Sequence, residues 1–195
     1  MSSSKTTANV ALLLFAFFSL LVTQVYAGTA TAWNDCSYSV YCAVVKENGG
    51  VANFQEVRPG NKVTVDIMSL PNGDGYTIMC KPTNTPNAPV TQIEFTRNDD
   101  TTRRLHFDLS TVAGAVFVND GMTMYVDEPR NSDFPTCYGA VCRAGENPCQ
   151  YAYTWDGDSK HGERACSTRA SIQWHMCLVD ENLSLPPPGT GAKVE

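Results

Sequence analysis

Two carboxylates, Glu94 and Asp108, have the residue type and spacing to act together in one site. Each is flanked on both sides by an aliphatic or aromatic residue, so the alternation predicts that the apolar neighbours face a core and the acids face outward. A hairpin turn centred on Thr101 would place Glu94 directly opposite Asp108. Like charges opposed on adjacent strands normally destabilise a sheet. The pair therefore suggests a use: general acid–base catalysis, cation coordination or hydrogen bonding to sugar hydroxyls.

The alternative interpretation is that these acids are ordinary solvated residues. Outward carboxylates are common on an exposed sheet, and a slip of one residue in the hairpin would separate the pair. Aromatic residues that could stack on sugar rings also have two interpretations, either as core residues or as exposed binding residues. Trp174 alternates with other apolar residues and is expected in the core, whereas Trp155 lies in a turn-rich segment and is the candidate for an exposed platform.

Other kinds of chemistry find little support in the sequence. His106, His161 and His175 share no short metal-binding spacing, so each is expected on a surface or strand face. The chain has neither a Gly-x-Ser-x-Gly nucleophile motif nor a glycine-rich phosphate-binding loop. We therefore expect no cofactor, no bound metal and no nucleophilic hydrolase mechanism.

The elements that must position the acids are β-strands. Four stretches alternate apolar and polar residues with a period of two, and turn-forming Asn, Asp and Gly residues separate such stretches. The stretches span residues 62–68, 91–97, 104–109 and 171–176. Three prolines make residues 82–89 a loop. Repeated short strands with tight turns predict an all-β sandwich or barrel.

The N-terminus predicts export. Lys5 precedes an apolar run from Val10 to Val22, which is too short to span a membrane but suits a signal peptide cleaved after Ala27. A membrane anchor is the alternative. We therefore expect a signal peptide over residues 1–27, a folded domain over residues 28–180 and a mobile Pro/Gly-rich tail over residues 181–195. The secreted protein is expected to be a soluble extracellular monomer.

The charge of the chain narrows its partners. The formal net charge is −6, with 20 acidic residues against 14 Lys and Arg. Binding to nucleic acids or anionic membranes relies on clustered basic residues, so neither is an expected partner. The only N-glycosylation sequon begins at Asn182, beside the predicted tail, and glycosylation there is expected to be sterically possible.

Eight cysteines provide the covalent framework. An even number of cysteines in an exported chain predicts four disulfides, although the sequence alone leaves 105 pairings open. Structural zinc is the alternative, but paired Cys-x-x-Cys elements are lacking. The cysteines are Cys36, Cys42, Cys80, Cys137, Cys142, Cys149, Cys166 and Cys177.

Several segments, taken in order, resemble those of thaumatin-like proteins. The resemblance runs from about residue 31 to residue 180 and is closest to the compact fungal branch, the Blastomyces yeast-phase-specific or antigenic thaumatin-like type. It implies a flattened, disulfide-stapled β-sandwich with a short disulfide-rich loop region from Cys137 to Cys166. The segments are residues 34–42, 57–60, 92–96, 107–110 with Gly114, and 137–142.

The resemblance also implies a disulfide pattern. Matching the segments to the family gives three pairs, and the fourth is the pair that remains. Thaumatins usually have sixteen cysteines, so the large loop domain that forms one wall of the family's cleft is expected to be nearly absent here. The implied pairs are Cys36–Cys177, Cys137–Cys166 and Cys142–Cys149, with Cys42–Cys80 remaining.

The acidic cleft of larger thaumatin-like proteins, associated with β-1,3-glucan binding and sometimes hydrolysis, is only partly matched. The resemblance places Glu94 and Asp108 at two of its acidic positions, with Asp156 or Asp158 near a third. Ala113 stands where another aspartate is expected, and no arginine lies near Tyr76, where the family has one. The resemblance therefore implies an incomplete cleft.

Three functions remain open from the sequence. The first is a secreted non-enzymatic protein that binds a cell-wall glycan of the β-glucan type, or a host extracellular protein, as an antigen or effector. Its candidate ligand-binding residues are Glu94, Asp108, Trp155, Asp156 and Asp158. The second is a weak endo-β-1,3-glucanase that uses Glu94 and Asp108, and the third is a structural cell-wall protein. The incomplete cleft favours the first over the second.

Overall fold

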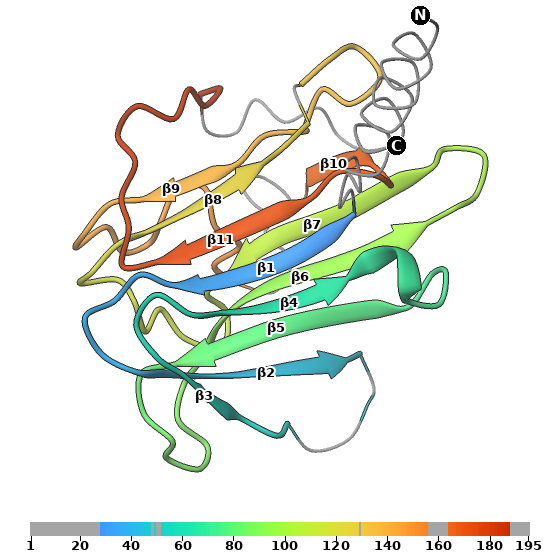
Figure 1. Cartoon of the computed structure of the whole chain (residues 1–195). Helices are drawn as coiled ribbons and strands as arrows, with labels where there is room; N and C mark the ends of the chain where they lie inside the picture. Colours follow the sequence, from blue (N-terminus) through green and yellow to red (C-terminus); the bar gives the residue numbers. More distant parts are fainter. Residues whose placement is uncertain (1–27, 48, 50–51, 129, 156–163, 188–195) are drawn as a thin grey trace, which may run out of the picture.

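A computed structural model describes residues 28–47, 49, 52–128, 130–155 and 164–187. Within these residues the chain forms two β-sheets that face each other as a sandwich, and no α-helix (Figure 1). The predicted all-β class is confirmed. The described residues contain no helix long and apolar enough to cross a membrane. The predicted signal peptide lies outside the described residues and stays a prediction.

The five-stranded sheet has the strand order β4-β1-β11-β8-β9. Its strands β1 and β11 pair in parallel and its other neighbours pair antiparallel. The strands are β1 (Thr29–Asn34), β4 (Lys62–Asp66), β8 (Met122–Val126), β9 (Ala140–Cys142) and β11 (Ile172–Met176). The alternating stretch predicted over residues 62–68 therefore ends earlier as a strand, because the 3-10 turn Ile67–Ser69 follows, with Asp66 as its N-cap.

The six-stranded sheet has the strand order β10-β7-β6-β5-β2-β3 and is antiparallel throughout. Its neighbouring strands β6 and β7 are those predicted from alternation to carry the paired acids. The strands are β2 (Val40–Lys46), β3 (Gln55–Val57), β5 (Gly75–Lys81), β6 (Thr91–Asn98), β7 (Arg104–Ser110) and β10 (Arg164–Ser167).

The core lies between the sheets and is built by the alternation seen in the sequence. Phe107 on β7 and Trp174 on β11 are both at most 2% exposed, and the Trp174 ring meets Phe117 edge to face with 5.9 Å between ring centroids. Burying large aromatic side chains of this kind contributes a major part of the hydrophobic stabilisation of a domain. The core position predicted for Trp174 is thus confirmed.

Four disulfides join the sandwich, and no free cysteine is present in the chain. Cys36 follows β1 and Cys177 follows β11, so their bond closes the same end of two parallel neighbouring strands. The bonds are Cys36–Cys177, Cys42–Cys80, Cys137–Cys166 and Cys142–Cys149, the four pairs that the resemblance implies.

Within the tail expected over residues 181–195, residues 181–187 contact residues that flank β9. Leu183 lies over Gly139, where a Cβ atom would come within 2.0 Å of the Met124 carbonyl oxygen and 3.2 Å of the leucine side chain. The Tyr151 hydroxyl donates a hydrogen bond of 2.9 Å to the Pro186 carbonyl. We call residues 181–187 the C-terminal strap; residues 188–195 lie outside the described residues.

Truncation after Asp180 is expected to lower the melting temperature by several degrees. The deletion removes the Leu183 packing, the Tyr151–Pro186 hydrogen bond and the Arg143–Glu181 ion pair of 3.0 Å. Together these contacts should contribute about 2 kcal/mol, or roughly 4–8 °C for a domain of this size. Thermal unfolding measures the effect. Truncation after Pro187 keeps all three contacts, and an equal loss in both truncated proteins would contradict a stabilising role for the strap.

Candidate functional site

The register of the six-stranded sheet places Glu94 directly opposite Asp108. Val45 on β2 is opposite Thr77 on β5, and Thr77 is opposite Glu94 on β6. Four side chains therefore form one row across β2, β5, β6 and β7 on the outer face of the sheet, because directly paired residues share a face. Thr101 lies at the centre of the β6–β7 connection, as the spacing predicts.

The row forms part of the floor of an open hollow of about 580 Å³. Glu94 and Asp108 are half-buried, and their apolar neighbours on the same strands point into the core. Hydroxyl and amide groups surround the acids. The hollow is lined by Val45, Lys46, Glu47, Gly49, Gly75, Tyr76, Thr77, Met79, Gln92, Glu94, Thr96, Asp108 and Tyr153.

Three carboxylates line the hollow, from Glu47, Glu94 and Asp108, against one cation, Lys46. The Lys46 ammonium lies 2.7 Å from the Asp74 carboxylate. The hydrogen bond to Asp74 raises the pKa of Lys46 above its ordinary value. Lys46 therefore stays charged and directs its charge to Asp74, which leaves the hollow predominantly negative.

Tyr153 is held in the hollow by a strand-like contact with the end of β7. Its N–H donates to the Leu109 carbonyl at 2.7 Å, and its carbonyl accepts the Thr111 N–H at 2.8 Å. A parallel bridge also pairs Tyr153 with Ser110. These bonds fix a half-exposed aromatic ring beside Asp108, where it can contact a bound sugar.

Ser110 lies two residues beyond Asp108 on the same face of β7, opposite Gln92 on β6. The residue is fully buried, and its hydroxyl oxygen has no hydrogen-bond partner among the described residues. Because buried polar groups are nearly always hydrogen-bonded, an unsatisfied hydroxyl next to a hollow needs an explanation. A water or a ligand donor that reaches the floor of the hollow would satisfy it.

Arg164, which the sequence analysis did not identify, lies behind the acids. It occupies the edge strand β10, opposite Phe107 on β7, and is completely buried. Its guanidinium donates to the Tyr151 carbonyl and lies 5.0 Å from the centre of the Tyr138 ring. Desolvation by burial lowers the pKa of Arg164, and the nearby tyrosines and Asp108 act in the opposite direction.

Arg164 partly changes the expectation of an incomplete cleft. No arginine lies near Tyr76 in the sequence, but the fold brings Arg164 into electrostatic reach of Asp108 from a strand more than fifty positions away. Arginine keeps its charge even when buried. The positive charge behind Asp108 therefore offsets part of the repulsion between the two carboxylates on adjacent strands.

Of the other predicted ligand-binding residues, the structure describes only Trp155. Trp155 is 60% exposed, as expected for a platform, but does not line the hollow. Asp156 and Asp158 lie outside the described residues, as does His161. Asn182 is exposed on the C-terminal strap, so its side chain is accessible for glycosylation, which stays a prediction. His106 lies half-buried in the strand that carries Asp108.

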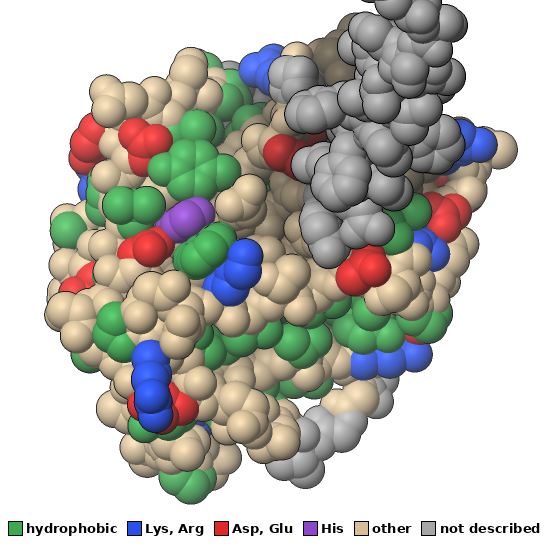
Figure 2. Space-filling model, in the orientation of Figure 1, with side chains coloured by type: hydrophobic (Ala, Val, Ile, Leu, Met, Phe, Trp, Pro, Cys, Tyr) green, Lys and Arg blue, Asp and Glu red, His purple; other side chains and the backbone are tan. Residues whose placement is uncertain are grey.

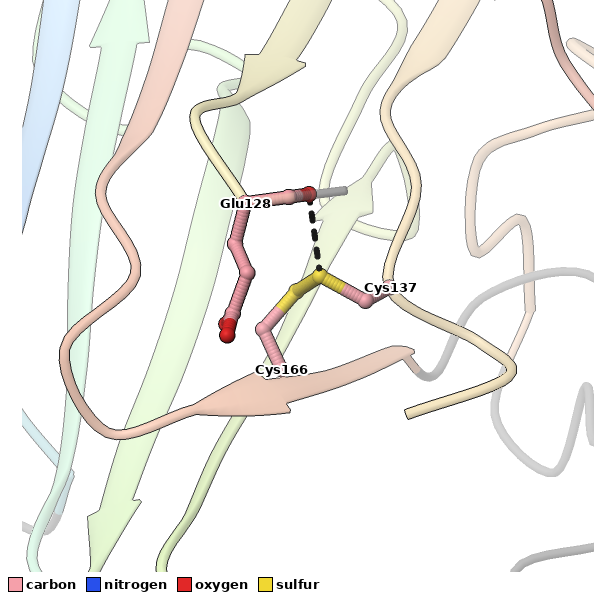
Figure 3. Close-up of side chains that lie close together, drawn as sticks. All are labelled: Glu128, Cys137 and Cys166. Atoms are coloured by element: carbon pink, nitrogen blue, oxygen red, sulfur yellow. Dashed lines mark hydrogen bonds between the residues drawn. A yellow bond between two sulfur atoms is a disulfide. The ribbon is translucent and has the colours of Figure 1, made fainter. Parts of the chain in front are cut away.

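One cluster has the composition of a metal site but not its chemistry. A ligand atom of Glu128 lies within 4.8 Å of the sulfur atoms of Cys137 and Cys166. Figure 3 shows that the two sulfurs are bonded to each other, with the Glu128 backbone carbonyl beside them. The Glu128 carboxylate accepts the Ser167 N–H at 2.8 Å. Because thiolates are the sulfur ligands of metals, the closed disulfide makes this cluster a structural support.

The opposite face of the sandwich carries a different surface, which is the one seen in Figure 2. The Trp33 ring stands between His175, stacked with 5.9 Å between centroids, and the Lys62 ammonium, 4.3 Å from its centre. His175 Nδ1 lies 2.7 Å from an Asp35 carboxylate oxygen. Both faces of the Trp33 ring are thus occupied by the protein's own side chains, which makes this ring a weaker platform than Tyr153.

Sequence reasoning missed Glu47, Tyr153 and Arg164. Glu47 directly follows β2, and its N–H donates to the Gly75 carbonyl at 2.8 Å, which brings it over the end of β5. The turn-forming residues Gly49 and Gly75 indicated that the chain reverses direction near Glu47. Tyr153 and Arg164 lie in short segments without a readable period, so no local pattern could assign them to the edges of β7.

Comparison with known proteins places the fold. The chain resembles the protein elicitor MoHrip2 from Magnaporthe oryzae with a TM-score of 0.59 and 16% identity, covering 78% of this chain and 100% of that protein. It resembles the thaumatin-like xylanase inhibitor TLXI with a TM-score of 0.50 and 15% identity, covering 76% and 99%. At these identities the likeness establishes the fold, which is thaumatin-like.

The sequence comparisons give the family. No curated protein matches the chain in sequence. The family model described as Blastomyces yeast-phase-specific protein matches residues 17–178, which include both sheets, the facing acids and all eight cysteines. This chain belongs to the Blastomyces yeast-phase-specific protein family.

Proposed function

We propose that the protein is a secreted, non-enzymatic binding protein that holds a cell-wall glycan in the hollow on the outer face of the six-stranded sheet. The observation that carries the proposal is the exact pairing of Glu94 with Asp108 in the floor of an open hollow of about 580 Å³. Two opposed carboxylates weaken a sheet unless something compensates. Arg164 offsets part of this repulsion from behind Asp108, and a ligand that donates hydrogen bonds to both acids would offset more of it.

The groups around the pair suit sugar hydroxyls. Ionised carboxylates accept hydrogen bonds, and the Thr77 and Thr96 hydroxyls and the Gln92 amide can both donate and accept. The Tyr153 ring offers an apolar face at the edge of the same hollow. An extended polysaccharide resting on this sheet would meet polar groups along several strands, which supports a chain-like ligand over a small compact one.

The position of the acids supports binding over hydrolysis. Glycosidases place two carboxyl groups so that they flank the scissile bond. Glu94 and Asp108 project from directly paired positions of one sheet. Both would therefore lie on the same side of a chain that rests on the floor of the hollow.

A weak endo-β-1,3-glucanase is the second candidate, and one observation favours it. Directly paired residues have Cβ atoms about 4.5–5.5 Å apart, which overlaps the carboxyl separation of about 5–5.5 Å in retaining glycosidases. A pull-down combined with a reducing-sugar assay on insoluble β-1,3-glucan, chitin and mannan separates the two. Binding without sugar release is expected; sustained release that is lost with Glu94→Gln would make the protein an enzyme.

Glu94→Gln is expected to weaken glycan binding about tenfold while leaving the protein at least as stable. The substitution removes one of two opposed charges, which relieves repulsion, and also removes an acceptor for the ligand. Asp108→Asn should weaken binding similarly but stabilise less, because it gives up the attraction of Arg164. Titration calorimetry and thermal unfolding provide the two measurements.

Asp133→Asn is the matched control for these variants. Asp133 is exposed and lies outside the hollow, so the control changes the net charge by the same amount. It should leave the affinity unchanged. A glycan-binding protein whose affinity is unaffected by both Glu94→Gln and Asp108→Asn would place the site elsewhere, with the exposed Trp155 as the next candidate.

A further inference from the structure

We infer that the hollow selects a cationic glycan, a polymer of amino sugars whose amines are free and protonated. The inference rests on the proposed function, because it concerns the same hollow. It adds the charge of the ligand, which the function proposed above leaves open.

The side chains that line the hollow carry more negative than positive charge. Its lining holds the carboxylates of Glu47, Glu94 and Asp108 and the single ammonium of Lys46, which is paired with Asp74. Among the described residues, Glu47 and Glu94 form no ion pair. The net charge of −6 adds to the negative field over this surface.

A neutral sugar chain would cover Glu47 and Glu94, which form no ion pair among the described residues, without matching their charge. Removing a carboxylate from water costs free energy unless an opposite charge or several hydrogen bonds replace the water. A protonated amine supplies both a charge and up to three donors. Amines on successive sugar units could meet Glu94 and Asp108 as the polymer crosses β6 and β7.

Ser110 provides a second, independent indication of a polar ligand at this place. It is fully buried on the face shared with Asp108, and its hydroxyl oxygen lacks a hydrogen-bond partner among the described residues. Leaving such a group unsatisfied costs stability in the free protein. An ammonium or hydroxyl donor of the ligand that reaches the floor between Gln92 and Tyr153 would recover that loss.

The shape of the site favours a polysaccharide over a basic protein loop. The floor is a row of side chains across four neighbouring strands, seen in Figure 1 as β2, β5, β6 and β7, and the hollow above it is broad and open. A lysine or arginine side chain of a partner protein would fit a narrow pocket better. The hydroxyl and amide groups between the acids match the hydroxyls that separate the amines of an amino-sugar polymer.

The test compares two oligomers with the same sugar backbone, one with free protonated amines and one with neutral acetylated amines. Glucosamine oligomers and N-acetylglucosamine oligomers of equal length are titrated into the full secreted protein by calorimetry, below the pKa of the free amine and at low ionic strength. The free-amine oligomer is expected to bind at least about tenfold more tightly, and this preference should fall as salt screens the charges. Glu94→Gln should reduce the affinity for the free-amine oligomer about five- to tenfold. The control Asp133→Asn should change it less than about twofold.

Each other outcome overturns the inference in a distinguishable way. Equal affinity for the two oligomers, or tighter binding of a β-1,3-glucan oligomer, would mean that the hollow binds a neutral glycan, and the proposed function would stand. Equal weakening by Glu94→Gln and Asp133→Asn would mean that only net charge attracts the polymer. Binding of a lysine-rich peptide but of no glycan would contradict both the inference and the proposed function.

Discussion

Replacing Cys36 and Cys177 together by alanine is expected to lower the free energy of unfolding by about 5 kcal/mol. The bond joins residues 141 positions apart, so it restricts the unfolded chain more than the other three bonds do. Domains of this size are stable by only about 5–15 kcal/mol, so the variant should be largely unfolded or poorly secreted. Denaturant unfolding and the secreted yield provide the measurements.

The matched control for this prediction is the Cys142–Cys149 bond. Its cysteines are 7 positions apart, and the same entropic account gives a loss of about 2.5 kcal/mol when both are replaced by alanine. Replacing both members of each pair avoids a free thiol in the comparison. Equal losses for the two double variants would contradict the entropic explanation and indicate that local packing determines the effect of each bond.

Arg164→Ala is expected to cost about 3–5 kcal/mol of stability. The side chain is completely buried, stacks on Tyr138 and donates to the Tyr151 carbonyl. Its removal leaves a cavity, an unsatisfied carbonyl and a carboxylate at Asp108 that has lost a nearby positive charge. Arg164→Lys should recover only part of the loss, because an ammonium has no planar face to stack on the ring.

Arg169→Ala serves as the control for the buried arginine, since Arg169 lies on an exposed turn a few residues further along. It should change the free energy of unfolding by less than about 0.5 kcal/mol. Denaturant unfolding followed by tryptophan fluorescence measures both variants. A loss below about 1 kcal/mol for Arg164→Ala would show that Arg164 does not support the strands that carry the acids.

The parts of the fold that the sequence predicted well are those with a repeated local pattern. Alternation around Glu94 and Asp108 indicated which side chains face the core, and the spacing about Thr101 gave the register that the sheet adopts. Both follow from the period of two in a strand. The disulfide pairs came from the resemblance, because spacing alone could not have selected them.

Features that depend on contacts between residues far apart in the sequence could not be predicted. The parallel pairing of β1 with β11 leaves no signature, because alternation looks the same in either direction. Arginine is usually exposed, so nothing local marked Arg164 as a buried support for Asp108. At Gly139 the missing side chain makes room for the Met124 carbonyl and lets Leu183 of the strap pack closely. A glycine in a sequence can mark either a flexible backbone or a close approach of another segment. Only the folded structure distinguishes the two.

If a glycan binds on the outer face of the six-stranded sheet, NMR mapping of backbone amide shifts will locate it on that face. The uniformly labelled secreted protein is titrated with a soluble β-1,3-glucan oligomer and, separately, with the glucosamine oligomer. We expect the largest shifts to cluster at residues that line the hollow, namely Thr77, Glu94, Asp108 and Tyr153. Shifts confined to the opposite sheet around Trp33, or no shifts with either ligand, would contradict glycan binding on this face.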